Sequence, residues 1–178
     1  MAQKSLIDGS APATPQELFE RLDQLGIPVV KHHHLPVFTV EEAKALKGSI
    51  SGAHLKNLFL RNKKGRMWLL VTSADRPLDL KEVGTILGSG RLSFGSSDRL
   101  MKYLGVIPGA VTPLAAINDR SQAVQVAIEE DLLEADALNV HPLDNSMTAS
   151  IAPNDLIRFL EAEGHSAQAV RFGDGEAG

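Results

Sequence analysis

The fold is decided by the stretch SGAHLKNLFL, residues 51–60, where a glycine-containing turn leads into an apolar strand. Leu58, Phe59 and Leu60 follow the turn residues as a short apolar run, which is typical of a strand with most of its side chains buried. Lys56 stands at the mouth of this strand, and burial of an ammonium group costs free energy unless the group is paired. Lys56 therefore either reaches solvent from the strand end or points into a pocket, and this stretch alone leaves both options open.

The neighbouring sequence predicts both helices and strands. Residues 57–61 are expected to pair with residues 67–72 across the turn NKKG. Capping boxes begin helices at Thr14 and Thr39, because each threonine is followed three residues later by glutamate. Further helices are expected from Asp79, Ser97 and Pro153, and further strands at residues 28–34, 92–94, 124–128, 138–142, 145–151 and 168–172. We therefore expect an α+β fold, a single domain with a mixed, mostly antiparallel sheet and flanking helices.

A length of 178 residues suits one domain that buries roughly two-thirds of its unfolded surface. We expect this domain to span residues 14–172, between flexible tails at residues 1–13 and 173–178. The sequence has no cysteine, which excludes disulfides, thiolate nucleophiles and cysteine-ligated zinc. No apolar run approaches the ~20 residues that span a membrane, and the N-terminus lacks the apolar core of a signal peptide. A cytoplasmic location without membrane contact is the expectation.

Charge is unevenly distributed along the chain, although the net charge is only −4. Residues 54–102 contain ten lysines and arginines against four aspartates and glutamates, so this segment carries +6 and the remainder −10. Such asymmetry is typical of one lobe that faces phosphates. The alternative is a set of solvated faces that do not converge in space. The candidates for contacts with phosphates are Arg61, Lys63, Lys64, Arg66, Lys81, Arg99 and Lys102.

Three consecutive histidines, His32 to His34, have the composition of a metal site or a tag. Successive side chains of a strand point to opposite faces, so at most His32 and His34 share one. Two ligands without a nearby acidic partner make a weak zinc site, and the internal position disfavours a tag. We therefore predict a partly exposed polar strand without a metal or cofactor, with His34 as the histidine that lines a pocket.

Residues 105–113 contain two glycines and two prolines, which impose a rigid, tightly turned loop. Such a loop holds backbone carbonyls and amides in fixed directions, which suits contacts with a small polar ligand. A purely structural turn and a binding loop are both compatible with this composition.

Three motifs occur together in this sequence: HLPVFT at residues 34–39 followed by a helix, the Lys56-Asn57 strand, and GAVTP at residues 109–113. In this order and spacing, the chain resembles the free-standing bacterial trans-editing proteins related to the insertion domain of prolyl-tRNA synthetase. The resemblance spans roughly residues 14–172. Within that group the chain is most similar to the deacylases that hydrolyse alanine mischarged onto the proline tRNA. Leu35 departs from the proline expected in the first motif, at a position that we interpret as structural.

The resemblance implies roles for particular residues. Lys56 matches a lysine that is essential for deacylation in that family, and Asn57 matches its neighbouring asparagine. The loop that begins at Gly109 corresponds to one near the aminoacyl ester, and His141 corresponds to a pocket histidine of the alanine-specific members. The expected catalytic residues are therefore Lys56, Asn57, Gly109 and His141. The expected substrate-binding residues are His34, Val37, Phe38, Thr39, Ile50, Pro113, Ser146 and Ala149.

The residues fit hydrolysis by water better than covalent catalysis. No Ser-His-Asp set stands out by spacing, and no serine lies in a Gly-x-Ser-x-Gly elbow. A positioned water is thus the expected nucleophile, and the resemblance implies that the 2′-hydroxyl of the tRNA helps to activate it. Selection of alanine is expected to depend on pocket size, since exclusion of the bulkier proline ring is easier than discrimination by one methylene. The residues expected on the pocket wall are Val37, Phe38, Ile50 and Ala149.

The implied partner is the acceptor stem and 3′ end of a mischarged tRNA, and prolyl-tRNA synthetase is a candidate second partner. Other functions stay open at this point. The basic segment fits a non-catalytic tRNA-binding module equally well, and the acidic remainder fits a domain that regulates a synthetase through protein contact. Within the enzyme class, the main alternative is a deacylase for another small amino acid or another tRNA.

Overall fold

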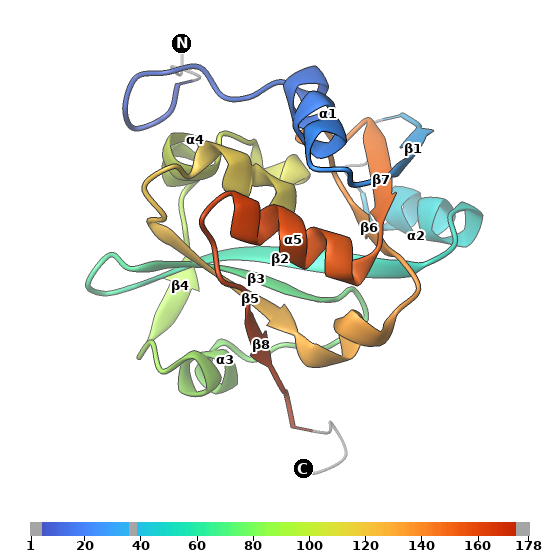
Figure 1. Cartoon of the computed structure of the whole chain (residues 1–178). Helices are drawn as coiled ribbons and strands as arrows, with labels where there is room; N and C mark the ends of the chain where they lie inside the picture. Colours follow the sequence, from blue (N-terminus) through green and yellow to red (C-terminus); the bar gives the residue numbers. More distant parts are fainter. Residues whose placement is uncertain (1–4, 36–38, 174–178) are drawn as a thin grey trace.

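Eight strands form one mixed sheet that runs through the centre of the molecule (Figure 1). The structure is a computed structural model that describes residues 5–35 and 39–173. Its strands are β1 (Val30–His33), β2 (Ala53–Asn62), β3 (Met67–Ser73), β4 (Leu92–Phe94), β5 (Val124–Glu129), β6 (Leu138–Val140), β7 (Met147–Ile151) and β8 (Gln168–Val170). They are ordered β1-β7-β6-β2-β3-β5-β8, and β4 pairs with β2 outside this path. Four of the seven pairings between the described strands are antiparallel, so the predicted fold class is confirmed.

Helices cover both faces of this sheet (Figure 1). They are α1 (Pro15–Gln24), α2 (Val40–Ser49), α3 (Leu80–Leu87), α4 (Ser97–Leu104) and α5 (Pro153–Ala162), with 3₁₀ turns η1 (Pro108–Ala110), η2 (Pro113–Asn118) and η3 (Glu130–Glu134). Leu104 of α4 and Leu156 of α5 share one apolar core with Leu69 of β3. Val83 of α3 belongs to a second core with Leu70. Because neighbouring strand residues point to opposite faces, α3 lies on the other side of the sheet from α4 and α5.

The helix starts follow the capping signals in the sequence. The side chains of Thr14 and Thr39 each accept a hydrogen bond from the backbone N–H of the glutamate three residues on. That glutamate side chain in turn accepts from the backbone N–H of the threonine. The cap of α4 is Ser96, not Ser97 as the sequence suggested. Ser96 has the extended backbone of a capping residue and accepts from the Arg99 N–H at 3.1 Å, whereas Ser97 is already helical.

The segment before α1 contacts the helices beside it. Leu6 is buried, and the Ile7 N–H donates to the Lys102 carbonyl at 2.8 Å. The Ala13 N–H donates to Oδ1 of Asn118 at 2.9 Å. Residues 5–13, which the sequence suggested as part of a tail, therefore make specific contacts with α4 and η2.

One edge of β2 is only partly paired. Its first residues, Ala53 and His54, pair with β6, and its last three, residues 60–62, pair with β4. Between these pairings, residues 55–59 have no strand partner on this edge among the described residues. The opposite edge pairs with β3 along residues 55–61. The strands β2 and β6 thus diverge at a fork, which opens this part of the sheet to a ligand.

Gly95 lies beside the β4 end of this edge and leaves no room for a side chain. Its N–H donates to the Phe59 carbonyl at 2.9 Å, and an added Cβ would lie 2.4 Å from the buried Phe59 ring. We expect Gly95→Ala to lower the free energy of unfolding by about 1–3 kcal/mol, because the ring has to shift within a packed core. Urea denaturation measures this change.

The matched control for this prediction is Gly48→Ala in α2, where none of the described atoms lies within 4 Å of the added methyl group. A helical alanine should leave the stability unchanged or raise it by up to about 1 kcal/mol. Equal unfolding midpoints for the two variants would contradict the predicted steric conflict at Gly95.

Candidate active site

A cleft of about 470 Å³ lies at the fork between β2 and β6. Its walls come from β2, the end of β6, α2, the turn after β3 and the loop after α4. The lining residues are Lys44, Leu46, His54, Leu55, Lys56, Asn57, Ala74, Asp75, Pro108, Gly109, Val111, Asn139, Val140, His141 and Thr148. These elements are far apart in the sequence, so the cleft exists only in the folded chain.

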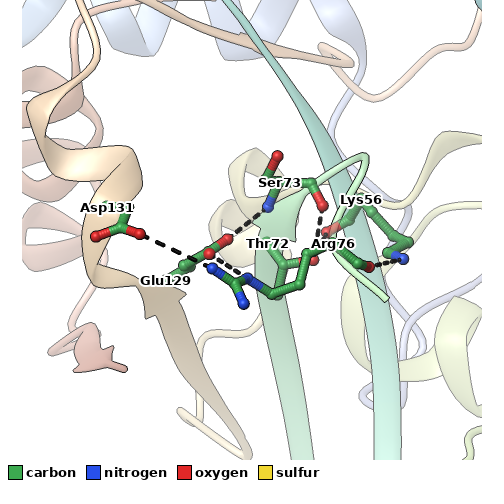
Figure 2. A network of polar contacts seen from close by, with 6 residues as sticks. All are labelled: Lys56, Thr72, Ser73, Arg76, Glu129 and Asp131. Atoms are coloured by element: carbon green, nitrogen blue, oxygen red, sulfur yellow. Dashed lines mark hydrogen bonds and ion pairs between the residues drawn. The ribbon is translucent and has the colours of Figure 1, made fainter. Parts of the chain in front are cut away.

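Lys56 points into this cleft. Its Nζ donates to the main-chain carbonyl of Arg76, in the turn after β3, at 2.6 Å (Figure 2). The side chain is half-buried. An ammonium group has three protons, of which the Arg76 carbonyl takes one, so two remain for a ligand or water. The sequence left open whether Lys56 reaches solvent or points into a pocket, and in the structure it points into a pocket.

Asn57 also lines the cleft, and its side-chain oxygen is buried. Alternation along β2 places its side chain on the face opposite to that of Lys56, and both reach the cleft because it surrounds the unpaired strand edge. The Oδ1 of Asn57 is buried and has no hydrogen-bond partner within the described structure. An unsatisfied buried acceptor costs about 1–3 kcal/mol, so a ligand that brings a donor to this atom recovers that free energy.

The main chain of Asn57 is directed toward the same opening. The Phe59 carbonyl points to this edge of β2, since it accepts from the Gly95 N–H. In an antiparallel pair, the N–H and C=O groups of every second residue point to the same edge, so those of Asn57 point to the fork as well. The fork therefore offers a backbone donor and a backbone acceptor beside the Asn57 amide.

His141 directly follows β6 and forms part of the opposite wall. Its Nδ1–H donates to the Met147 carbonyl at 3.1 Å, which leaves the lone pair of the neutral ring on Nε2. Burial lowers the pKa of His141 below its ordinary value of 6.5; the bond to Met147 opposes this shift, and nearby His34 adds to it. The ring is therefore uncharged at neutral pH, and Nε2 can accept a proton.

Thr148 connects His34 to the cleft. The Nδ1–H of His34 donates to the Leu35 carbonyl at 2.7 Å, so the Nε2 atom accepts from the Thr148 hydroxyl at 2.9 Å. With its proton engaged in this way, the Thr148 oxygen keeps its lone pairs for a donor in the cleft.

The loop after α4 forms a rigid wall. It folds into the two 3₁₀ turns η1 and η2, and each begins with a proline, whose missing N–H is not needed at that position. Thr112 is fully buried and caps η2 by accepting from the Leu114 N–H at 3.2 Å. Pro108, Gly109 and Val111 of this loop line the cleft.

The structure brings some of the predicted site residues together and leaves others apart. All four expected catalytic residues, Lys56, Asn57, Gly109 and His141, line the one cleft. His34 reaches it through Thr148. The predicted substrate-binding residues that do not line it are Thr39, Ile50, Pro113, Ser146 and Ala149. Val37 and Phe38 lie outside the described residues.

Sequence patterns did not single out several of the residues that line the cleft. Its apolar width is set by Leu46, Leu55, Val111 and Val140, whereas Ile50 and Ala149 are buried away from it. Alternation along β7 could have identified Thr148, because its neighbour Ala149 points to the other face. Leu46 comes from α2, and no local signal reports where a helix packs.

The predicted phosphate-binding residues do not form one surface. Lys81 lies on α3 and Arg99 on α4, which cover opposite faces of the sheet. Lys63 lies beyond the far end of β2, and seven strand residues from Lys56 span about 23 Å. Besides Lys56, the cleft lining among the described residues includes Lys44, which is exposed on α2. The other predicted phosphate contacts, Arg61, Lys64, Arg66 and Lys102, lie on β2, on the turn after it and on α4.

The consecutive histidines are not assembled into a metal site in the part of the chain that the structure describes. There, no three histidine, cysteine, aspartate or glutamate side chains are grouped so that they could hold a metal ion. His32 lies 3.3 Å from the Ser150 hydroxyl, and His34 bonds to Thr148. Over residues 5–35 and 39–173, no helix has the length and apolar character needed to cross a membrane.

Residues 34–159 match the family model of the aminoacyl-tRNA editing domain. The chain belongs to this family. The matched region contains every residue that lines the cleft, from Lys44 to Thr148. The enzyme class predicted from the sequence, an aminoacyl-tRNA deacylase that acts in editing, is confirmed by this membership.

Relatives of this editing-domain protein match it over most of their own length. The prolyl-tRNA editing protein ProX of Acetoanaerobium sticklandii is 38% identical over 158 residues, which cover 88% of this chain and 96% of the relative. The prolyl-tRNA synthetase associated domain-containing protein 1 of Danio rerio is 36% identical over 183 residues, 97% of this chain and all of the relative (100%). A proposed trans-editing enzyme for prolyl-tRNA synthetase shares the fold, with a TM-score of 0.64 at 20% identity over 90% of this chain and 99% of that chain.

The pKa of His141 leads to a pH prediction. If neutral His141 accepts a proton during deacylation, the rate should fall as the pH drops through the pKa of His141, with a midpoint below 6.5 because burial lowers that pKa. Rates of amino-acid release between about pH 5 and pH 8, after subtraction of spontaneous ester hydrolysis, measure the midpoint. His141→Asn should remove this acid limb, and a limb that persists in the variant would assign it to another group.

Proposed function

We propose that this chain is a trans-editing deacylase that hydrolyses the alanyl ester of tRNA(Pro). The observation that carries this proposal is the half-buried Lys56, bonded to the Arg76 carbonyl, in the same cleft as Asn57, whose Oδ1 has no hydrogen-bond partner among the described residues. Contacts with phosphates alone would require neither the fixed ammonium nor the orphaned acceptor. The names of the relatives, which refer to prolyl-tRNA editing and to prolyl-tRNA synthetase, support the choice of tRNA.

The acceptors of the cleft suit the α-ammonium group of an aminoacyl ester. Within residues 5–35 and 39–173, Asn57 Oδ1 has no hydrogen-bond donor, and the Thr148 oxygen keeps its lone pairs for one. An alanyl ammonium group has three N–H donors, whereas the secondary ammonium of proline has two and carries a ring. Apolar Leu55 and Val140 lie beside these acceptors, where the alanine methyl group would be accommodated.

The reaction that we propose is attack by water without a covalent intermediate. A water oxygen bonds to the ester carbonyl carbon while His141 Nε2 takes its proton, and the tRNA 2′-hydroxyl helps to orient that water. Lys56 and the Asn57 N–H stabilise the developing oxyanion. The bond to the 3′ oxygen then breaks, and this oxygen takes the proton back from the imidazolium ring. The products are alanine and tRNA with a free 3′-hydroxyl.

The first test is release of radiolabelled alanine from Ala-tRNA(Pro), with Pro-tRNA(Pro) as a control. Wild type should release alanine and spare proline. Lys56→Ala should lower the rate by at least about 100-fold, because a preorganised donor to the oxyanion is lost. Binding of tRNA without release would favour a non-catalytic tRNA-binding module, and release of another small amino acid would change the substrate.

A second substrate tests the proposed role of Asn57. N-acetylalanyl-tRNA(Pro) carries no ammonium group, so Asn57→Ala should slow its hydrolysis much less than that of Ala-tRNA(Pro). Equal effects on both substrates would mean that Asn57 does not recognise the amino group.

We further propose that Lys44 contacts a phosphate of the tRNA 3′ end, and that Lys63 and Lys64 contact the acceptor stem. The proposed location is the cytoplasm, and prolyl-tRNA synthetase is a candidate protein partner. Lys44→Ala should reduce the slope of log Kd against log salt by about 0.7, one single-strand phosphate contact, for both full tRNA and a short CCA-ended strand. The double variant Lys63→Ala/Lys64→Ala should reduce this slope for full tRNA only. An unchanged slope for full tRNA in the Lys44 variant would overturn the assignment of Lys44, and an unchanged slope in the double variant would overturn that of Lys63 and Lys64.

A further inference from the structure

The carbonyl that holds Lys56 belongs to a turn that is itself fastened to the sheet (Figure 2). This turn runs from Ser73, the last residue of β3, to Arg76. A main-chain carbonyl moves with the backbone that carries it. The location of the Lys56 ammonium therefore depends on the contacts that fix the turn.

Glu129, the last residue of β5, fixes both ends of the turn (Figure 2). Its Oε2 accepts from the Ser73 N–H at 2.7 Å, and its Oε1 accepts from the Arg76 Nε. The Glu129 side chain is only 3% exposed, and a buried carboxylate is tolerated only when it is paired in this way. One carboxylate thus joins the first and last residues of the turn to β5.

Two further contacts hold the Arg76 guanidinium. Its Nη2 lies 3.8 Å from Oδ2 of Asp131, and its Cζ lies 5.2 Å from the centre of the Phe172 ring. The guanidinium is therefore placed by β5, η3 and the residues after β8, none of which lines the cleft.

We propose that Arg76 and Glu129 are positioning residues that act on the reaction through Lys56. A lysine side chain loses rotamer entropy when its ammonium is fixed. The Glu129–Arg76 ion pair holds the accepting carbonyl in place before the substrate arrives, so the ammonium is already ordered. This inference rests on the deacylase function proposed above.

The kinetic test is the variant Glu129→Gln. Its amide keeps the shape and can still accept from Ser73, but it loses the charge that binds Arg76. We expect kcat for alanine release to fall by about 10- to 100-fold with little change in KM, because a small misplacement of a positioned group has effects of this size. In a Lys56→Ala background, the same substitution should cause no further loss, since both act through one ammonium group.

A matched control separates positioning from general destabilisation. Glu163→Gln breaks another partly buried ion pair, Arg21–Glu163 at 2.7 Å, which joins α1 to the end of α5 away from the cleft. It should leave kcat unchanged. If Glu129→Gln does not fold, the second variant is Arg76→Lys, which keeps the charge but not the guanidinium geometry. It should also lower kcat.

The Lys56 amine provides a readout that needs no tRNA. Acylation of Lys56 by an amine-reactive ester, followed by mass spectrometry, should be several-fold faster in Glu129→Gln than in wild type or Glu163→Gln, because the ammonium loses its fixed acceptor. If wild type releases no amino acid, the deacylase proposal fails, while the labelling rates still test the positioning. Unchanged labelling with unchanged kcat, an equal loss in Glu163→Gln, or a further loss in the Lys56→Ala background would overturn the inference.

Discussion

The structure depends on the short length of the pairing between β2 and β6. They pair in parallel over two residues, Ala53 and His54, and then separate. Had the pairing continued, the backbone groups of residues 55, 57 and 59 would be bonded to β6 and its continuation, and His141 would lie against β2. Separation after two residues keeps the start of β2 anchored to β6 and leaves its edge unpaired at Lys56 and Asn57. The second edge stays paired with β3 along residues 55–61, so this opening does not loosen the strand.

This open edge explains how two residues adjacent in sequence can serve one site. Lys56 and Asn57 must point to opposite faces of a strand, and in a closed sheet they would be separated by the sheet itself. At the unpaired edge the cleft extends around the strand and receives both. The donor reaches it from the α3 side and the acceptor from the α4 side, and the peptide between them faces the ligand.

The sequence could predict what depends on local signals. The threonine caps of α1 and α2, the turn NKKG and the apolar run at residues 58–60 each report their own structure, and all of these elements were confirmed. The four residues that share the cleft, Lys56, Asn57, Gly109 and His141, came from resemblance rather than from spacing. Nothing local shows that Leu46 lines the same cleft as Leu55, or that Glu129 holds a turn more than 50 residues before it, because tertiary packing alone decides such contacts.

The contact between Phe172 and Arg76 has a practical meaning for work with this protein. The aromatic ring comes from the residues after the last strand, yet it supports the guanidinium whose own carbonyl accepts from Lys56. A change to the chain near residue 172 thus acts on the Lys56 ammonium through two contacts, first between Phe172 and the Arg76 guanidinium and then between the Arg76 carbonyl and Lys56. An affinity tag is therefore better placed before α1, since the contacts made by residues 5–13 are with α4 and η2 and do not include Arg76.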